Sequence, residues 1–508
     1  MSLVRGFLRN VLGSYLASLI AIAVKLALLP FLFWQLGKER YGLWTVVFSF
    51  GMTTIVFDMG LMGAMRRFQS DAIAKGDARK ANEVLGLSLL LYGGLGIAAM
   101  LVVLSGVWWL PQVVPVPPEL QGELLFALGA VGLYMLARFV RGALAGVMFG
   151  ANRIDLTRLT STFERVLFAG FAVALLLGWS RRLEALAAAL LASSALWLVL
   201  SYVAARRCFP QLKLRVGSPR SPLLRPMLSF GAYSLLSTLA AVLSQHAPKL
   251  AVGRFLGLAK AAELNIVLVL ALQVEMLVRL LALPLFGVAA RVDRERRRAV
   301  YQRGSRICAM FALCLMVPLG VFSHVLLGQW VGPELAYTGD VLILLLAAAW
   351  LNLVQLPAVH IIMATERIGF LSWVLLGRSV LFTAVLLAML RFTSLGLMSV
   401  AVASLAASVP ISGIVLPVYA CRRLGLGLPA YLARSLARPV LSGGLILAAS
   451  LAARALWRPP TLAWSALYVT GVGVLGLLIA YCLGISGEDR SALRKALPRR
   501  LGRTGAAR

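Results

Sequence analysis

The feature that most constrains this chain is a succession of apolar runs, each long enough to cross a lipid bilayer. A helix needs about 20 apolar residues to span a hydrocarbon core roughly 30 Å thick. Runs of this length recur along the sequence, and we expect about fourteen transmembrane helices. Their predicted bounds are 11–36, 41–65, 83–110, 122–149, 162–178, 184–205, 228–253, 263–289, 305–328, 340–363, 370–390, 396–420, 436–456 and 462–484.

Composition supports the same fold class. The chain is 60% hydrophobic and 14% charged, with a mean hydropathy of +0.88, whereas a soluble domain is roughly half apolar and a quarter charged. We therefore expect an all-α polytopic protein whose solvent is mostly the bilayer. Its five cysteines form no C-x-x-C pair, so neither a disulfide framework nor a metal site is expected, and we expect no cofactor.

Positive charge is unevenly distributed among the loops. The chain has 50 Lys and Arg against 19 Asp and Glu, a net charge of +31. In a soluble protein this excess would suggest nucleic acid as a partner, but basic residues in short loops also orient membrane helices. The basic segments are 66–82, 206–226, 291–306, 421–434 and the tail after residue 485. They predict a multi-pass membrane protein with both termini cytoplasmic and no nucleic-acid partner.

A weak internal repeat predicts two related halves. Leu12–Leu19 resembles Phe230–Ser237, and each segment opens a span that ends in a Leu-Gly pair, Leu36-Gly37 and Leu256-Gly257. Repeated halves around a central site are typical of secondary transporters. The predicted organisation is an N-lobe of six helices (1–205), a basic linker (206–226), a C-lobe of six helices (227–434), two extra helices (435–484) and a basic tail (485–508).

Motifs for catalysis are missing from the sequence. It contains no P-loop, no H-E-x-x-H and no G-x-S-x-G. Gly471, Gly473 and Gly476 match G-x-G-x-x-G inside an apolar span, and Gly142, Gly146 and Gly150 have G-x-x-x-G spacing, so both sets indicate close helix packing. The predicted outer loops do not exceed about a dozen residues. We therefore expect a transporter and not an enzyme.

Ionisable residues inside the predicted spans are the candidate functional residues. A charge at the middle of a bilayer costs roughly 2.5–3.5 kcal/mol or more, so it usually faces a cavity or a partner. The basic ones are Lys25, Arg138, Arg141, Lys249, Arg279 and Arg378, and the acidic ones are Asp58, Glu263 and Glu275. The excess of basic residues predicts a cavity that attracts an anion, and the planar guanidinium of Arg suits phosphate.

Each candidate has an alternative explanation. Lys25 lies near the middle of the first span, where its stem is too short to reach either interface, which favours a functional role. Arg279 follows Glu275 by four residues, so the two form either an internal ion pair or part of the cavity. Arg138 and Arg141 share a helical face, and they either grip a diphosphate together or extend toward the cytoplasm.

The remaining candidates have more than one possible role. Lys249 lies near the outer end of its span and either extends to the interface or lines the cavity. Arg378 is a further candidate for the cavity. Asp58 either carries a coupling proton or neutralises a neighbouring charge. The histidines His246, His324 and His360 lie in or near separate spans and are expected to be packing residues.

Two motifs near the N-terminus resemble a known family. Leu36-Gly-Lys-Glu-Arg-Tyr-Gly-Leu-Trp44 and Phe57-Asp-Met-Gly-Leu-Met-Gly-Ala-Met-Arg66, followed by the loop 67–82, are similar to the amino-terminal signature of Wzx-type polysaccharide flippases. These flippases belong to the multidrug/oligosaccharidyl-lipid/polysaccharide (MOP) exporter superfamily. Gly150–Ile154 and Pro284 are similar as well. The arrangement of spans is similar along the whole chain, while the specific motifs lie mainly in residues 10–90.

The resemblance implies two six-helix lobes around a cationic cavity. It implies that an undecaprenyl-diphosphate-linked oligosaccharide moves from the cytoplasmic to the periplasmic leaflet by alternating access. An ion gradient (H⁺ or Na⁺) or the membrane potential would supply the energy, the protein would act as a monomer, and polysaccharide polymerase machinery is an implied partner. Lys25 and Arg279 lie in helices comparable to those that carry cavity cations in related lipid II flippases, where two extra helices bind the lipid tail.

One departure and two rival functions accompany the resemblance. Many relatives carry an acidic residue late in helix 7, where this chain has His246-Ala-Pro-Lys249. The identity of the coupling ion is therefore undetermined, and Asp58 and Glu275 are the candidate residues for ion coupling.

A multidrug exporter of the same superfamily is one rival function, although such proteins favour acidic cavity residues. A membrane-embedded glycan polymerase or ligase is the other, and the short outer loops weigh against it.

Overall fold

A computed structural model describes residues 2–58, 60–229, 232–286, 294–364, 368–456 and 459–484. Within these ranges every regular element is helical, and twelve helical stretches are long and apolar enough to cross a membrane. The predicted class, an all-α polytopic membrane protein, is confirmed. The chain divides into two compact units, which are described separately.

The first two predicted spans form one interrupted helical stretch, Tyr15–Asp58. Helix α1 (Ser2–Thr53) is broken at Gly37, whose φ of 76° and ψ of 171° are not helical. After α1 come a 3₁₀ segment, η1 (Thr54–Asp58), and α2 (Leu61–Ala74), which begins after Gly60 in the left-handed region. The expectation of a continuous second span over 41–65 was therefore wrong, because the chain leaves the α-helix next to Asp58.

Two other spans also differ from the prediction. The seventh, expected at 228–253, consists of α8 (Ala232–Gln245) and α9 (Ala247–Leu256), which meet at His246. The fifth, α5 (Ile154–Gly178), begins at Ile154 and not at residue 162. Its first turns carry Asp155 and Arg158, and these charges lower the local hydropathy on which the predicted boundary depended.

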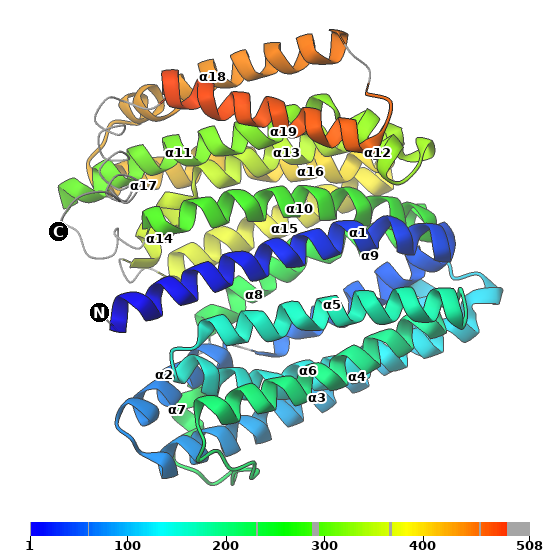
Figure 1. Cartoon of the computed structure of the whole chain (residues 1–508), viewed down its shortest axis with the longest axis vertical. Helices are drawn as coiled ribbons and strands as arrows, with labels where there is room; N and C mark the ends of the chain where they lie inside the picture. The colour runs from blue at the N-terminus through cyan, green and yellow to red at the C-terminus, as the bar shows by residue number, and fades with distance from the viewer. Residues whose placement is uncertain are drawn as a thin grey trace, which may run out of the picture. The chain divides into compact units, whose positions relative to one another are not determined.

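Unit 1 comprises Met1–Leu270 and Arg367–Ala407. Besides the elements above it contains α3 (Ala78–Val113), η2 (Pro118–Leu120), α4 (Gln121–Gly150), α6 (Leu183–Cys208), α7 (Leu224–Ser229), the first part of α10 (Leu258–Phe286), α15 (Ile368–Phe392) and α16 (Met398–Ser408). Helix α4 packs against both α3 and α6 (Figure 1).

The glycines of α4 provide the space for this packing. A Cβ added at Gly146 would lie 1.8 Å from Cε of Met65, and one at Gly150 would lie 2.8 Å from Cγ of Gln69. Gly142 faces the ring of Tyr92, with the nearest atom at 3.3 Å. The predicted packing role of the three glycines is confirmed, because a larger side chain would push α2 and α3 away.

The two Leu-Gly pairs of the internal repeat have similar backbone conformations at their glycines. Gly37 has φ and ψ of 76° and 171°, and Gly257 has 89° and 171°. A positive φ is accessible to glycine at little cost. Both copies of the repeat therefore leave the helix in the same way at the same position. The division into two six-helix lobes stays a prediction.

Unit 2 comprises Ala271–Glu366 and Ser408–Arg508. Its described elements include α11 (Arg294–Val321), α12 (Ser323–Trp330), η4 (Pro333–Thr338), α13 (Gly339–Val354), α14 (Leu356–Ala364), the π-helical η5 (Val409–Val415), α17 (Leu416–Leu424), α18 (Leu428–Leu456), α19 (Leu462–Ile479) and the π-helical η6 (Ala480–Gly484). Helices α18 and α19 pack side by side (Figure 1).

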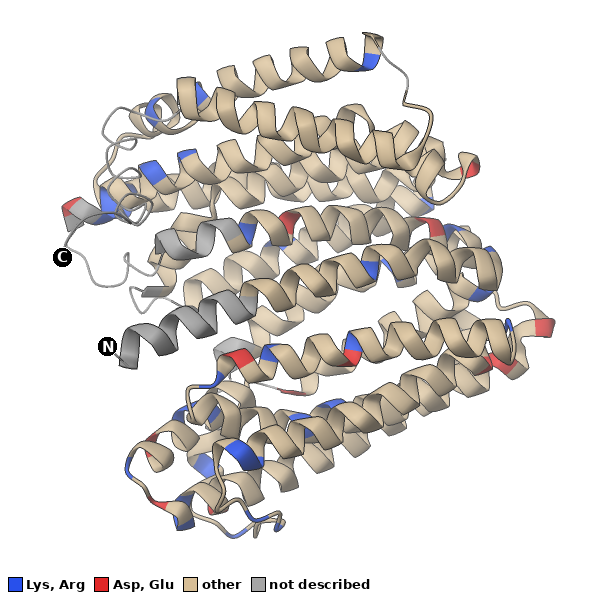
Figure 2. Ribbon diagram, viewed as in Figure 1, with Lys and Arg blue, Asp and Glu red and all other residues tan. Residues whose placement is uncertain are grey.

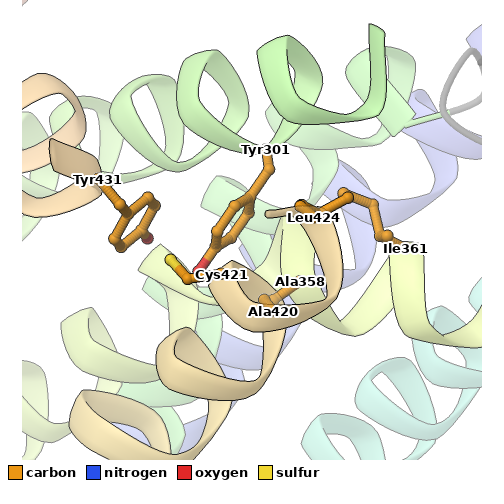
Figure 3. Packing of buried hydrophobic residues seen from close by; sticks show 7 residues of the cluster. All are labelled: Tyr301, Ala358, Ile361, Ala420, Cys421, Leu424 and Tyr431. Atoms are coloured by element: carbon orange, nitrogen blue, oxygen red, sulfur yellow. The ribbon is translucent and has the colours of Figure 1, made fainter. Parts of the chain in front are cut away.

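A pair of tyrosines holds α11 and α18 together in unit 2. The buried rings of Tyr301 and Tyr431 stack with centroids 4.5 Å apart and planes 4° apart, beside Cys421 of α17 (Figure 3). The Tyr301 hydroxyl donates a hydrogen bond to Oε1 of Gln355 at 3.0 Å. Such a ring pair contributes about 0.5–1.5 kcal/mol beyond its buried area, so it stabilises the α11–α18 contact.

Candidate functional site

Basic side chains from three separate segments of unit 1 approach one another. Lys25 of α1 is exposed, and Lys249 of α9 is partly buried. The two ammonium groups lie within electrostatic range of each other. His246, at the junction of α8 and α9, lies within electrostatic range of both lysines and of Arg138 in α4. We call Lys25, Arg138, His246 and Lys249 the basic cluster. Like charges in a medium of low dielectric repel strongly, and a bound anion would relieve that repulsion.

A second group of charges adjoins the basic cluster between α4 and α5. Glu164 is buried, with 8% of its surface exposed, and it attracts Arg138, Arg141 and Arg165. Arg165 also lies within electrostatic range of Lys25. Because Arg138 and Arg165 each interact with both groups, the α4–α5 charges and the basic cluster form one continuous electrostatic system.

Arg141 is held against α5 and α6. Its guanidinium carbon lies 4.4 Å from the centre of the Trp197 ring, and Nη2 donates a hydrogen bond to the Thr157 carbonyl at 3.3 Å. Trp197 in turn stacks on Tyr134, with centroids 6.3 Å apart. Arg138 and Arg141 thus start from one helical face but have different neighbours, and a joint grip on a diphosphate stays a prediction.

Asp58 accepts a hydrogen bond at the point where the second span leaves the α-helical conformation. The Tyr92 hydroxyl of α3 donates to Oδ1 of Asp58 at 2.6 Å, and the carboxylate attracts Arg66 and Arg138. Arg66 lies over the ring of Phe149, 3.6 Å from its centre. The hydrogen bond holds the Asp58 carboxylate in place, and Arg138 connects it to the basic cluster.

Arg378 lies in a helix that is joined to α8 by two serine pairs. The hydroxyl oxygens of Ser237 and Ser372 are 2.9 Å apart, and those of Ser244 and Ser379 are 2.8 Å apart. Interhelical hydroxyl pairs of this kind hold membrane helices together. Arg378 itself is partly buried next to Ser379, and its predicted role in substrate binding stays a prediction.

The two candidates of unit 2 pair with each other. Nη2 of Arg279 lies 3.3 Å from Oε2 of Glu275, one turn earlier on α10. The predicted ion pair is therefore formed, and 47% of the Arg279 side chain is exposed. Arg279 also lies within electrostatic range of Cys308 and His360. Glu263 of unit 1, the remaining acidic candidate, accepts a hydrogen bond from Lys260 at 2.8 Å.

Sequence reasoning missed Glu164 and Arg165. The predicted fifth span started at residue 162, which left both residues at its edge. Asp155, Arg158 and Arg165 recur at spacings of three and seven residues, as expected for one face of a helix. That amphipathic signal was present in the sequence and would have extended the span. Among the residues that the structure describes, no group of three or more His, Cys, Asp or Glu side chains could hold a metal ion.

Comparisons with known proteins match the chain to a family and to a curated relative. Residues 7–290, more than half of the chain, match the family described as polysaccharide biosynthesis protein. The uncharacterized membrane protein EpsK of Bacillus subtilis (strain 168) is 21% identical over 375 residues, which are 70% of this chain and 71% of EpsK.

Two solved structures share the fold over nearly their full lengths. The lipid II flippase MurJ in an inward closed conformation has a TM-score of 0.68 at 11% identity, over 96% of this chain and 99% of MurJ. An inward-facing multidrug resistance MATE family transporter of the MOP superfamily has a TM-score of 0.65 at 18% identity, over 80% of this chain and 98% of the transporter. At these identities the likeness establishes the fold alone.

Proposed function

This chain belongs to the polysaccharide biosynthesis protein family, with the fold of MOP superfamily transporters, and we propose that it flips an undecaprenyl-diphosphate-linked oligosaccharide across the bacterial inner membrane. The oligosaccharide moves from the cytoplasmic to the periplasmic leaflet by alternating access, for surface polysaccharide synthesis. Both termini lie in the cytoplasm in this proposal, because the basic loops are retained there.

The observation that carries the proposal is the basic cluster. Lys25, Arg138 and Lys249 come from three helices, α1, α4 and α9, and place like charges near one another inside unit 1. Charges in membrane segments are expensive unless they have partners. A diphosphate supplies several negative oxygens in a small volume, and both ammonium and guanidinium groups bind such oxygens with charge-assisted hydrogen bonds.

Energy for transport comes from an ion gradient or the membrane potential in this proposal. Asp58 is the candidate for proton coupling in unit 1, because its carboxylate accepts a short hydrogen bond from the Tyr92 hydroxyl and attracts Arg66 and Arg138. Glu275, paired with Arg279, is the candidate in unit 2. Protonation of either carboxylate would release its basic neighbour to interact with the substrate.

Alanine substitutions in the basic cluster test the proposal. A hydrogen bond to a charged group contributes about 1.5–3 kcal/mol, so K25A and K249A are each expected to weaken binding of an undecaprenyl-diphosphate-linked oligosaccharide about ten- to hundredfold. R279A tests Arg279, the candidate substrate-binding cation of unit 2. The matched control is K75A, because Lys75 is exposed and pairs with Asp71. Binding to purified protein and export of surface polysaccharide are measured at equal protein levels.

Three results would contradict the proposal. Normal export in a K25A/R279A variant would show that these cations are not used. Efflux of cationic drugs without binding of a polyprenyl diphosphate would assign the chain to the multidrug exporters. Turnover of a lipid-linked sugar by the purified protein alone would make it an enzyme.

A further inference from the structure

The segment between α6 and α7, residues 209–223, is fixed to the start of α3. Nδ2 of Asn82 donates a hydrogen bond to the Gln211 carbonyl at 3.0 Å, and Oδ1 of Asn82 accepts one from the Lys213 amide at 2.7 Å. The Gly217 amide donates to the Gly86 carbonyl at 2.8 Å. Ser221 adds a hydrogen bond to Oε1 of Glu83 at 2.9 Å. We call residues 209–223 the docked linker.

The position of the docked linker relative to the membrane follows from α3. A Cβ at Gly86 would lie 2.6 Å from the Arg215 carbonyl oxygen, so only glycine allows the linker to approach this closely. The apolar part of α3 was predicted to begin at residue 83, and Gly86 lies about 4.5 Å further along the helix axis. By this predicted boundary, the linker backbone contacts α3 where the helix enters the bilayer, at the level of the lipid headgroups.

Apolar side chains of the docked linker are unusually exposed for a polar loop. Leu214 is 52% exposed and Val216 is 70% exposed. In water this exposure would be unfavourable, but at the boundary between headgroups and acyl chains both side chains can enter the apolar phase.

The neighbouring cations are not neutralised. The exposed side chains of Lys213, Arg215 and Arg220 form no ion pair with any residue in the described part of the chain. Lys75 and Lys80, at the same end of unit 1, both pair with Asp71, at 2.7 and 3.1 Å. Hydrogen bonds from these two lysines hold the pKa of the Asp71 carboxyl below its ordinary value. Lys213, Arg215 and Arg220, which lie beside Leu214 and Val216, have no such carboxylate partner among the described residues.

We propose that the docked linker is an interfacial binding site for anionic phospholipid headgroups, of which phosphatidylglycerol is the probe. Leu214 and Val216 enter the acyl boundary, and Lys213, Arg215 and Arg220 contact the phosphates. A topological signal needs basic residues only. It requires neither the hydrogen bonds to Asn82 nor the close approach at Gly86 nor two exposed apolar side chains. The site is independent of the transported substrate.

Lipid titration of the full chain tests the site. Protein in dodecyl maltoside micelles is titrated with dioctanoyl phosphatidylglycerol and, in parallel, with dioctanoyl phosphatidylcholine. The shift of the thermal unfolding midpoint gives the apparent affinity for each lipid. We expect the wild-type protein to prefer phosphatidylglycerol. A basic residue near an anionic surface corresponds to about a fivefold change in affinity, so K213Q/R215Q/R220Q should lose more than tenfold in affinity for phosphatidylglycerol and little for phosphatidylcholine.

Three further variants complete the test. L214S/V216S should weaken binding of both lipids, and K75Q should behave like the wild type because Lys75 is already paired with Asp71. If the triple variant does not fold, R215Q alone should show about a fivefold loss. Equal affinity of the wild-type protein for the two lipids, or full preference in the charge variants, would overturn the proposal and leave these charges with a purely topological role.

Discussion

At the scale of single residues, aromatic side chains contact several charged groups of unit 1. Arg141 lies over Trp197 and Arg66 lies over Phe149, at 4.4 and 3.6 Å from the ring centres. Tyr92 donates a hydrogen bond to Asp58. The face of an aromatic ring attracts a cation without adding a negative charge. Aromatic contacts can therefore stabilise basic residues in unit 1 while the site stays positive overall.

Arg141→Lys tests the stacking at this scale. The substitution keeps the positive charge but removes the planar group that lies on the indole of Trp197, and a desolvated cation–π contact is worth up to about 2 kcal/mol. We expect a lower midpoint of thermal unfolding in detergent. Trp197→Leu should lower the midpoint as well, and the double variant should lose less than the sum of the two. Additive losses would show that the two side chains are not coupled.

At the scale of elements, the turn that follows Gly37 joins α1 to three other helices. Nε of Arg40 lies 2.8 Å from Oε1 of Glu123, and Oε2 of Glu123 accepts a hydrogen bond from the Leu183 amide at 3.0 Å. Asn265 of α10 donates to the Tyr41 hydroxyl at 2.8 Å. The motif that resembles the family signature therefore connects α1 with α4, α6 and α10.

Gly42→Ala tests this junction. A Cβ at Gly42 would lie 2.0 Å from the Leu258 carbonyl oxygen, a backbone atom that cannot turn away. Overpacking of this kind costs about 1–3 kcal/mol, so we expect less folded protein and a lower unfolding midpoint. The control is Gly94→Ala in α3, because a Cβ there meets nothing within 4 Å. The control should retain or raise the midpoint, since alanine favours a helix interior. Equal midpoints for the two variants would contradict the packing role.

At the scale of the whole molecule, the distribution of charge predicts the orientation in the membrane. In unit 1, Lys and Arg gather where α2, the start of α3 and the docked linker lie (Figure 2). The loop at the opposite end of α3, before α4, contains Glu119 and no basic residue. The membrane potential and the insertion machinery retain basic loops on the cytoplasmic side. We therefore predict that the end of unit 1 with the basic residues faces the cytoplasm.

Labelling of single cysteines tests the orientation. In a variant without native cysteines, Glu119→Cys should react with a membrane-impermeant maleimide added to intact spheroplasts, and Lys75→Cys should react only in inside-out vesicles. Both positions are exposed, so access to the reagent depends on the side of the membrane. The reverse pattern would mean that the basic loops are periplasmic.

Much of the fold follows from local sequence. The apolar length of a segment determines whether lipid can be its solvent, and backbone groups in lipid must be satisfied within the helix. The spans were therefore predictable one by one. Interruptions of the helices within the spans were less predictable. Gly37 and Gly257 mark their turns in the sequence, whereas the interruption next to Asp58 and the junction at His246 lie inside apolar segments that are long enough for a continuous helix.

What the sequence by itself determined is the class of protein, the approximate positions of its spans and the identity of most charges within them. Only the tertiary structure decided which charges meet. It brought Lys25 near Lys249, bonded Asp58 to Tyr92, and added Glu164 and Arg165 to the site. The physical reason is that hydropathy is a property of each segment alone. The neighbours of a side chain depend instead on how helices distant in sequence pack, and that depends on details such as the glycines at 42 and 146.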